Sequence, residues 1–267
     1  MPKISVIMGI YNCASTLQEA LDSLYAQTYQ DFEIILCEDG SKDNTYELAL
    51  ENQKKHNNIV LLRNPHNMGL NQTLNNCLAV AQGEYIARMD GDDICDSTRF
   101  EKQVKFLDEH PEYAIVSNPM FYFDENGIFG RGRAKEGEVS KNVFNYGTPF
   151  CHAPCMVRKE AYDKVGGYTV DKRLLRVEDY ELWVKMYAAG YKGYNLGEHL
   201  YSMRDDKNAV ARRTIKGRMN VIYAHWLAYK RLNLSFFKFV KVATITFAKA
   251  FTPTFIYNYF HKKNLNR

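Results

Sequence analysis

The sequence predicts an α/β fold built on a mostly parallel sheet with helices on both faces. Through the first 110 residues, short and nearly continuous apolar runs, typical of buried strands, alternate with segments whose apolar residues recur at helical spacing. Polar residues follow each apolar run directly. Since ligands of such folds bind beyond the carboxyl ends of the strands, these polar positions are the candidate binding residues.

The alternation starts at the N-terminus. Residues 4–10 form an apolar run that ends at Tyr11 and Asn12, and apolar residues from Leu17 to Leu24 then recur at helical spacing. The same order of strand, polar break and helix is repeated three times. We expect strands at residues 4–10, 32–37, 59–62 and 85–89, and helices at residues 17–24, 45–56, 70–81 and 99–110.

The pattern changes after a fifth strand, which we expect at residues 113–117. Two short apolar runs, at residues 120–123 and 128–129, flank the turn Asp124–Gly127 and indicate a β-hairpin. Antiparallel additions and a helix through residues 180–187 are expected to follow.

No internal repeat, low-complexity tract or flexible linker divides the chain into independent parts. We therefore predict one α/β domain over residues 1–202, with a first half at 1–117 and a second at 118–202. A C-terminal lid and helical appendage is expected at residues 203–267.

Composition indicates a soluble globular protein, because 25% of the residues are charged and 46% are hydrophobic. Six cysteines are scattered, mostly inside apolar segments, which favours reduced thiols and a cytoplasmic location. The N-terminus enters a strand without the pattern of a secretory signal, and no apolar run of about 18 residues indicates a spanning helix.

The net charge of +4 conceals an asymmetry. Residues 203–267 carry 14 Lys and Arg against two acidic residues, a net charge of +12, so residues 1–202 carry −8. Aromatic residues are interleaved with these cations, which suggests peripheral binding to an anionic membrane surface. Nucleic acid is the competing partner for such a segment, and we do not expect it. Helices that pack an apolar stripe on the domain would give the same pattern.

The most informative motif is the turn Met89–Asp93, read Met-Asp-Gly-Asp-Asp, at the end of the fourth expected strand. Three carboxylates on one tight turn repel one another unless a cation lies among them. Oxygen ligands of this kind suit Mg²⁺ or Mn²⁺, which keep coordination positions open for phosphate oxygens. An acidic surface turn is the alternative, since Asp and Gly favour turns for backbone reasons alone.

Polar residues at the other strand ends are candidates for binding a nucleotide. The loop at Tyr11 can wrap a base, and Asp39 can accept hydrogen bonds from a base or a ribose. A helix N-cap or an Asx-turn explains Asp39 equally well. Asn67 and Gly69 are also consistent with a role confined to shaping a turn.

Five motifs together resemble family 2 of the GT-A-fold glycosyltransferases, as found in bacterial polysaccharide biosynthesis. These enzymes invert the configuration at the transferred sugar and use a nucleotide-diphosphate sugar. The matching segments are Ile4–Asn12, Glu38–Asp43, Asn67–Leu70, Met89–Asp93 and Glu178–Trp183. Their order and number make the match specific, although each is weak alone. The resemblance implies a Rossmann-like sheet that binds the nucleotide sugar in residues 1–117, with a small antiparallel addition on the acceptor side at residues 118–202.

The resemblance also assigns the donor site. It implies that Asp90 and Asp92 hold a Mn²⁺ or Mg²⁺ ion at the donor diphosphate, with Asp93 in support. The residues expected to bind the donor are Ile10, Tyr11, Asn12, Glu38, Asp39, Asn67, Gly69, Arg88, Asp90, Gly91, Asp92, Arg204 and Lys207. A UDP-sugar is the expected donor.

On the acceptor side, the family's motif makes Asp179 the catalytic base. Glu178 and His152 are expected to support catalysis or to contact the acceptor. The alternatives are a charged first turn of a helix for Glu178 and Asp179, and a structural histidine for His152.

The chain departs from the family downstream. Where many relatives carry Tyr-Arg-x-His, this chain has Met203–Lys207 without the histidine, so Arg204 and Lys207 are expected to supply the cations of the lid. The predicted function is transfer of a sugar to a hydroxyl of a glycan or lipid-linked acceptor in surface polysaccharide synthesis. A sugar nucleotidyltransferase is disfavoured because the first loop lacks a Gly-rich phosphate-binding sequence. A non-catalytic binding or membrane scaffold protein is the other alternative.

Overall fold

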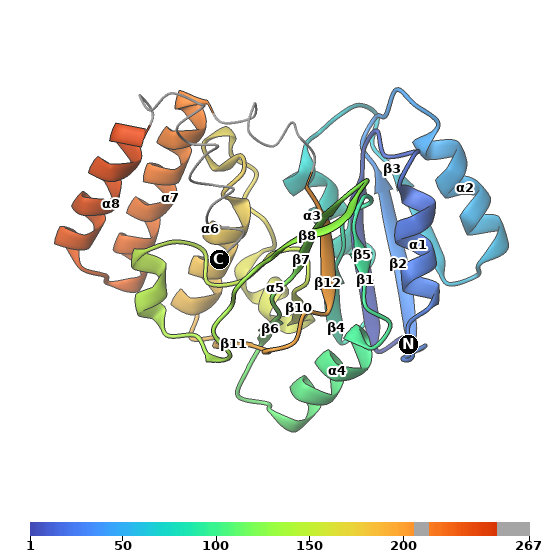
Figure 1. The fold of residues 1–267 in the computed structure, drawn as a ribbon, viewed down its shortest axis with the longest axis horizontal. Coiled ribbons are helices and arrows are strands. Elements are labelled where there is room, and N and C mark those ends of the chain that lie inside the picture. Colours follow the sequence, from blue (N-terminus) through green and yellow to red (C-terminus); the bar gives the residue numbers. More distant parts are fainter. Residues whose placement is uncertain (206–213, 250–267) are drawn as a thin grey trace.

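The computed structural model describes residues 1–205 and 214–249, which form two β-sheets with helices around them (Figure 1). The strands of the larger sheet are β1 (Ile4–Ile10), β2 (Phe32–Glu38), β3 (Ile59–Arg63), β4 (Tyr85–Arg88), β6 (Ile115–Ser117), β9 (Gly137–Glu138), β10 (Met156–Arg158) and β11 (Gly193–Asn195). Those of the smaller sheet are β5 (Ile94–Cys95), β7 (Phe121–Asp124), β8 (Gly127–Arg131) and β12 (Tyr201–Arg204). The helices are α1 (Leu17–Tyr25), α2 (Thr45–Lys55), α3 (Leu70–Val80), α4 (Arg99–Glu109), α5 (Lys159–Val165), α6 (Glu178–Ala188), α7 (Ile215–Leu232), α8 (Phe236–Lys249) and the 3₁₀ segments η1 (Lys141–Asn145) and η2 (Lys172–Leu174).

The larger sheet confirms the predicted α/β class. Its strand order is β3-β2-β1-β4-β10-β6-β11-β9, and the first four strands are parallel. Beyond β4 the sheet is mixed, because β10 runs antiparallel to both β4 and β6. The parallel portion therefore coincides with the part of the chain in which strands and helices alternate.

Side chains of the parallel strands alternate between two cores. In β1, Val6 and Met8 belong to the core under α1, α2 and α4, whereas Ile7 belongs to the core that includes α3, α5 and α6. All three are fully buried. Burial on both faces explains why the strands read as continuous apolar runs rather than as alternating ones.

The smaller sheet has the order β5-β12-β7-β8 and contains the predicted hairpin as β7 and β8. β12 lies between β5 and β7, so a strand from near residue 200 joins the acidic turn to the hairpin. The domain boundary expected after residue 202 falls inside β12, and residues 203 and 204 are part of this sheet.

The appendage packs on the domain through α7. Ala224, Ala228 and Leu232 of α7 are buried in the same core as α6. At the start of α6, the buried Glu181 accepts a hydrogen bond from Arg231 of α7. α8 packs on α7 and leaves much of its own surface exposed (Figure 1).

No helix within the described residues is long and apolar enough to cross a membrane. All six cysteines are present as free thiols, five of them buried. Cys151 is the half-buried one, and it lies in the segment before β10.

Candidate active site

The acidic turn follows β4 and is held in place by β12. Asp93 is buried, and its carboxylate accepts hydrogen bonds from the Tyr201 hydroxyl (2.9 Å) and from the backbone N–H of Arg204 (2.8 Å). The backbone N–H of Asp90 donates to the same Tyr201 hydroxyl (3.2 Å). Burial and the charges of Asp90 and Asp92 raise the pKa of Asp93 well above its usual range. Asp93 is therefore a structural support of the turn.

Asp90 and Asp92 differ in their partners. Asp90 Oδ1 lies 2.6 Å from an Nη atom of Arg88, a buried side chain whose Nε has no partner among the described residues. Asp92 lies at the protein surface, yet partial desolvation in the turn, followed by the charge of Asp90, raises the pKa of its carboxyl group. A cation between the two carboxylates would relieve this repulsion.

These two carboxylates fit a hard divalent cation such as Mn²⁺ or Mg²⁺. Within residues 1–205 and 214–249, no group of three or more His, Cys, Asp or Glu side chains gathers to hold a metal. An ion held by two carboxylates would keep coordination positions open for phosphate oxygens of a substrate.

Gly91 allows the acidic turn to lie against the loop after β1. A Cβ atom at Gly91 would come within 2.9 Å of Cys13 Sγ, and the Gly91 carbonyl accepts a hydrogen bond from Thr16 Oγ1 (2.9 Å). Gly91 thus allows the close approach of the two loops, and its contact with a donor stays a prediction.

A pocket of about 220 Å³ lies at the carboxyl ends of β1 and β2, and Asp39 forms one wall. Its carboxylate accepts hydrogen bonds from the backbone N–H groups of Met68 (2.7 Å) and Gly69 (3.0 Å) and from the Asn64 amide (2.8 Å). Asp39 is therefore not the N-cap of the helix that follows it. It binds the start of α3 instead, where Gly69 has a φ of +86°.

The remaining wall of this pocket comes from residues that the sequence also singles out. Tyr11 and Asn67 are exposed, and both line it together with Gly69. Among the predicted donor residues, the structure brings Tyr11, Asp39, Asn67 and Gly69 together in one small cavity.

Three predicted donor residues are not part of the wall of this pocket. Ile10 is fully buried, and Asn12 has a φ of +48° with its side-chain oxygen accepting the Lys42 N–H (2.8 Å). Glu38 is fully buried and accepts hydrogen bonds from the Ser41 N–H and from Arg63 Nε (3.2 Å). Ile10, Asn12 and Glu38 thus shape the loops around the pocket, and their contact with a donor stays a prediction.

Arg204 lies over the acidic turn. Its Nε donates to the Asp92 carbonyl (3.0 Å), its Nη2 pairs with Glu19 of α1, and its guanidinium lies 4.4 Å from the ring centre of Phe123. A cation is thus fixed beside Asp90 and Asp92. Lys207, the other cation expected in the lid, lies outside the described residues.

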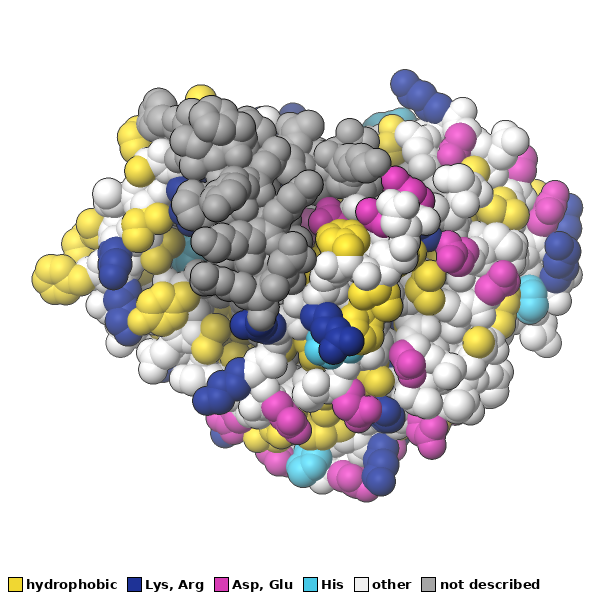
Figure 2. Space-filling model, in the orientation of Figure 1, with side chains coloured by type: hydrophobic (Ala, Val, Ile, Leu, Met, Phe, Trp, Pro, Cys, Tyr) yellow, Lys and Arg dark blue, Asp and Glu magenta, His cyan; other side chains and the backbone are white. Residues whose placement is uncertain are grey.

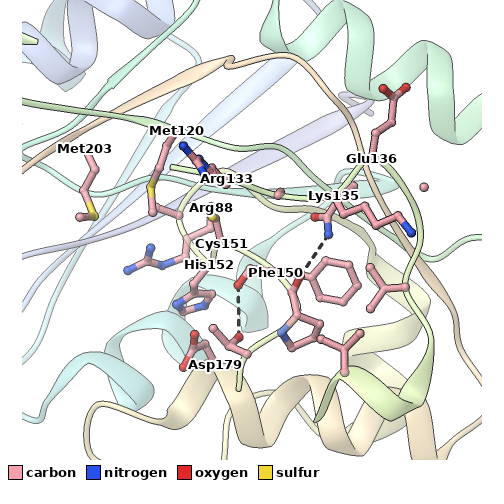
Figure 3. Close-up of a pocket in the computed structure, with 18 of the residues that line it drawn as sticks. Arg88, Met120, Arg133, Lys135, Glu136, Phe150, Cys151, His152, Asp179 and Met203 are labelled. Carbon is pink, nitrogen blue, oxygen red and sulfur yellow. Dashed lines mark hydrogen bonds between the residues drawn. The ribbon is translucent and has the colours of Figure 1, made fainter. Parts of the chain in front are cut away.

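A larger cavity of about 970 Å³ lies on the other side of the acidic turn and contains Asp90, Glu178 and Asp179 (Figure 3). The two neighbouring carboxylates stand in the first turn of α6. Burial raises the pKa of Asp179, and burial together with the charge of Asp179 raises that of Glu178. Glu178 Oε2 is buried and has no hydrogen-bond partner among the described residues.

His152 borders the same cavity, close to Asp179 and Arg88 in Figure 3. Its Nε2 lies 2.8 Å from the Tyr168 hydroxyl, and its ring packs edge-on against Trp183. Burial, with a smaller contribution from the charge of Arg88, lowers the pKa of His152 well below its usual range. The neutral ring is thus fixed by structural contacts while one edge remains in the cavity.

Sequence reasoning missed several residues of the site. Tyr201 joins Asp90 and Asp93, and Arg133, Lys135 and Asn195 line the large cavity. None belongs to a local motif, because each comes from a strand or loop distant in sequence from the turn. Only Arg133 and Lys135 have a feature that the sequence alone could show, because two cations stand close together just after the predicted hairpin.

In chemical terms, the site places the carboxylates of Glu178 and Asp179 in the wall of a cavity that also includes Asp90 of the acidic turn. The arrangement can hold an anionic leaving group at Asp90 and Asp92 while a second carboxylate, Asp179, accepts a proton.

Solved structures with the same fold define the class of this protein. The chain resembles Staphylococcus aureus TarS, residues 1–349, in complex with UDP-GlcNAc, with a TM-score of 0.71, 18% identity, and coverage of 90% of this chain and 70% of that one. It also resembles the mannosyltransferase PcManGT of Pyrobaculum calidifontis in complex with GDP-Man and Mn²⁺, with a TM-score of 0.62, 18% identity, and coverage of 96% and 83%. The fold is that of the GT-A glycosyltransferases.

The sequence comparisons place the chain within that class. Residues 5–166 match the family described as Glycosyl transferase family 2. The putative glycosyltransferase EpsE of Bacillus subtilis (strain 168) is 40% identical over 265 residues, which cover 99% of this chain and 95% of that protein. An Escherichia coli UDP-Gal:alpha-D-GlcNAc-diphosphoundecaprenol beta-1,3-galactosyltransferase is 30% identical over 273 residues, with coverage of 100% and 98%. The chain belongs to glycosyltransferase family 2, which confirms the resemblance seen in the sequence.

Proposed function

We propose that this glycosyltransferase moves a sugar, with inversion, from a UDP-sugar to a hydroxyl of a lipid-linked glycan acceptor in surface polysaccharide synthesis. One observation carries the proposal: Asp90 of the acidic turn and Asp179 of α6 border the same cavity. A donor held at the turn would present its anomeric carbon to an acceptor that contacts Asp179.

Asp179 is the proposed general base. The acceptor oxygen forms a bond to the anomeric carbon, the bond from that carbon to the diphosphate breaks, and UDP leaves with the electron pair. The proton of the acceptor hydroxyl passes to the Asp179 carboxylate. A raised pKa supports this role, because a base whose pKa lies closer to the working pH accepts a proton more readily.

Asp90 and Asp92 are the proposed ligands of Mn²⁺ or Mg²⁺. When bound, such an ion supplies positive charge that stabilises the leaving diphosphate. The Arg204 guanidinium, fixed over the same turn, adds a second positive charge. The Mn²⁺ in the PcManGT complex supports this assignment.

The pocket at Asp39 is the proposed site of the nucleotide base. Asp39 Oδ1 already accepts from Asn64 and Met68, whereas Oδ2 accepts only from Gly69 and keeps a lone pair that can accept from a base N–H. Uridine is favoured by the ligand of TarS and by the donor in the name of the galactosyltransferase, whereas PcManGT binds a guanosine nucleotide.

A donor screen tests the proposed function. Thermal unfolding of the full chain is followed with UDP-, GDP- and dTDP-sugars, each with and without Mn²⁺, since a bound ligand raises the midpoint by mass action. We expect the largest rise with one UDP-sugar in the presence of Mn²⁺. A larger rise with a GDP-sugar would overturn the choice of base, and no rise with any donor would overturn the function.

The acceptor lipid places the proposed enzyme at the inner face of the cell membrane, and α8 provides a surface for it. Phe236, Phe237 and Phe247 of α8 are exposed at 54%, 85% and 54%, among the lysines of the same helix. Figure 2 shows hydrophobic and basic side chains intermixed at this edge of the molecule. Such a surface matches an anionic bilayer in both charge and apolar character.

Point substitution tests this membrane contact without removing the helix. Phe237→Ser with Lys238→Gln should reduce retention on liposomes that contain anionic lipid, whereas Lys105→Gln, on the exposed side of α4, should not. Equal retention of the double variant and the wild type would leave α8 with a packing role only.

A further inference from the structure

The large cavity extends beyond the catalytic carboxylates to a wall that carries two cations. Arg133 and Lys135 belong to the segment after β8, and both line the cavity. Figure 3 shows His152 and Asp179 at one side, with Arg133 and Lys135 across from them. Acids and cations both line the cavity, since Glu136 and Glu138 stand close in sequence to the two cations and Arg88 pairs with Asp90.

The two cations have no carboxylate partners. Neither Arg133 nor Lys135 forms an ion pair with any carboxylate of residues 1–205 or 214–249. Of the acids next to them, Glu138 pairs with Lys192 (3.5 Å), and Glu136 points away from both cations in Figure 3. Arg133 and Lys135 line the cavity without an ion pair among the described residues, so they are available to an anionic ligand.

The donor diphosphate does not account for them. Its proposed site is the turn of Asp90 and Asp92, where Arg204 already supplies a fixed positive charge. An anion on the basic wall therefore belongs to the other substrate. Repulsion by Glu178 and Asp179 would keep that anion away from the reacting hydroxyl.

The surface next to this wall is apolar and leads toward α8. Val143 of η1 lines the cavity and is 39% exposed, and η1 packs against both α7 and α8. Just beyond η1, the exposed ring of Tyr146 lies 5.5 Å from Lys238 Nζ of α8. Apolar side chains thus connect the cavity to the proposed membrane surface.

We propose that Arg133 and Lys135 bind the diphosphate of a lipid-diphosphate sugar acceptor, with its lipid lying along η1 and its sugar hydroxyl reaching Asp179. This inference rests on the proposed function and adds the residues that recognise the acceptor class. The donor and acceptor diphosphates then bind at opposite sides of one cavity.

Calorimetry with the full chain tests the proposal in the presence of saturating UDP and Mn²⁺, which occupy the donor side. The probe is octyl diphosphate, and octyl glucoside serves as its neutral counterpart. We expect the Arg133→Gln, Lys135→Gln double variant to bind octyl diphosphate about tenfold more weakly or worse, because two charge-assisted contacts are lost. Its affinity for octyl glucoside should be unchanged.

Arg131→Gln is the matched control. Arg131 is exposed in the same hairpin but stacks 5.4 Å from the Phe121 ring centre and is not part of the cavity wall. Equal weakening by this variant would mean that surface charge alone attracts the probe, and an undiminished affinity in the double variant would refute the proposal. A loss of UDP affinity in the double variant would assign the cations to the donor. Failure of the wild type to bind UDP would instead count against the proposed function.

Discussion

The donor side and the acceptor side of the site are built differently. Around the donor pocket the polar side chains are occupied: Asp39 accepts three hydrogen bonds, Glu38 accepts two, and Asp93 is fixed by Tyr201 and Arg204. In the acceptor cavity, Glu178 Oε2 and Asn195 Oδ1 are buried without partners among the described residues.

This difference indicates what each side has to recognise. Fully bonded loops keep one shape, which suits a nucleotide that is common to many enzymes of the family. Buried polar atoms without partners are costly unless a ligand satisfies them, so they mark positions where an acceptor is expected. Arg88 stands where the two sides meet, with one nitrogen on Asp90 and its Nε without a partner in residues 1–205 and 214–249.

Asp179→Asn should have the largest effect, and it should affect transfer without affecting donor binding. We expect kcat for transfer to fall by roughly a thousandfold, the order of magnitude contributed by a general base, while UDP affinity stays unchanged. The thermal midpoint should not fall, because the raised pKa shows that the fold disfavours the charged carboxylate. Turnover equal to wild type would remove Asp179 as the base.

Asp92→Asn should damage the donor side instead. UDP affinity measured by calorimetry in Mn²⁺ should fall by roughly tenfold or more, the size of effect expected for a metal ligand. Without metal, the variant and the wild type should bind UDP alike. The exposed Asp163→Asn is the control, and an equal loss of UDP affinity there would contradict the assignment.

The pH dependence of transfer should reflect the protonation of Asp179. Because burial raises the pKa of Asp179 above the ordinary value of about 3.9, the base is lost to protonation at a higher pH than a free aspartate would be. We expect kcat/KM to fall as pH drops through this raised pKa. If kcat/KM fell only at the pH expected for a free aspartate, or at a lower pH, another residue would be the base.

Tyr201→Phe should have the smallest effect on transfer and a clear effect on stability. It removes the hydroxyl that donates to the buried Asp93, a loss of about 1–3 kcal/mol in the free energy of unfolding. Urea unfolding measures this, with Tyr113→Phe as the control because its hydrogen bond to Glu138 is exposed. Equal stability of the two variants would mean that the donor-side network is looser than its geometry indicates.

The sequence predicts the donor side better than the acceptor side, for a physical reason. Parallel strands buried on both faces read as apolar runs, and the residues after them meet at one edge of the sheet. That rule finds Asp39 and Asp90 without any knowledge of contacts. It does not distinguish Glu38, which points inward, from Asp39, which borders the pocket.

The acceptor side follows no such rule. Its wall is assembled from η1, the segment after β8 and the start of α6, which are far apart in the chain. Arg133 and Lys135 have no sequence spacing relative to Asp179 that predicts their meeting. No local sequence pattern predicts that β10 lies between β4 and β6 and runs antiparallel to both.

The ion pair between Glu181 and Arg231 links the helix that carries the proposed base, Asp179, to the C-terminal helices. Glu181 stands two residues after Asp179 in the first turn of α6, and Arg231 lies near the end of α7, on which α8 packs. If α8 binds a bilayer as proposed, a tilt of α7 would reach the turn that carries Asp179 through this ion pair. The proposed membrane contact and the proposed base would then be linked by one buried carboxylate, that of Glu181.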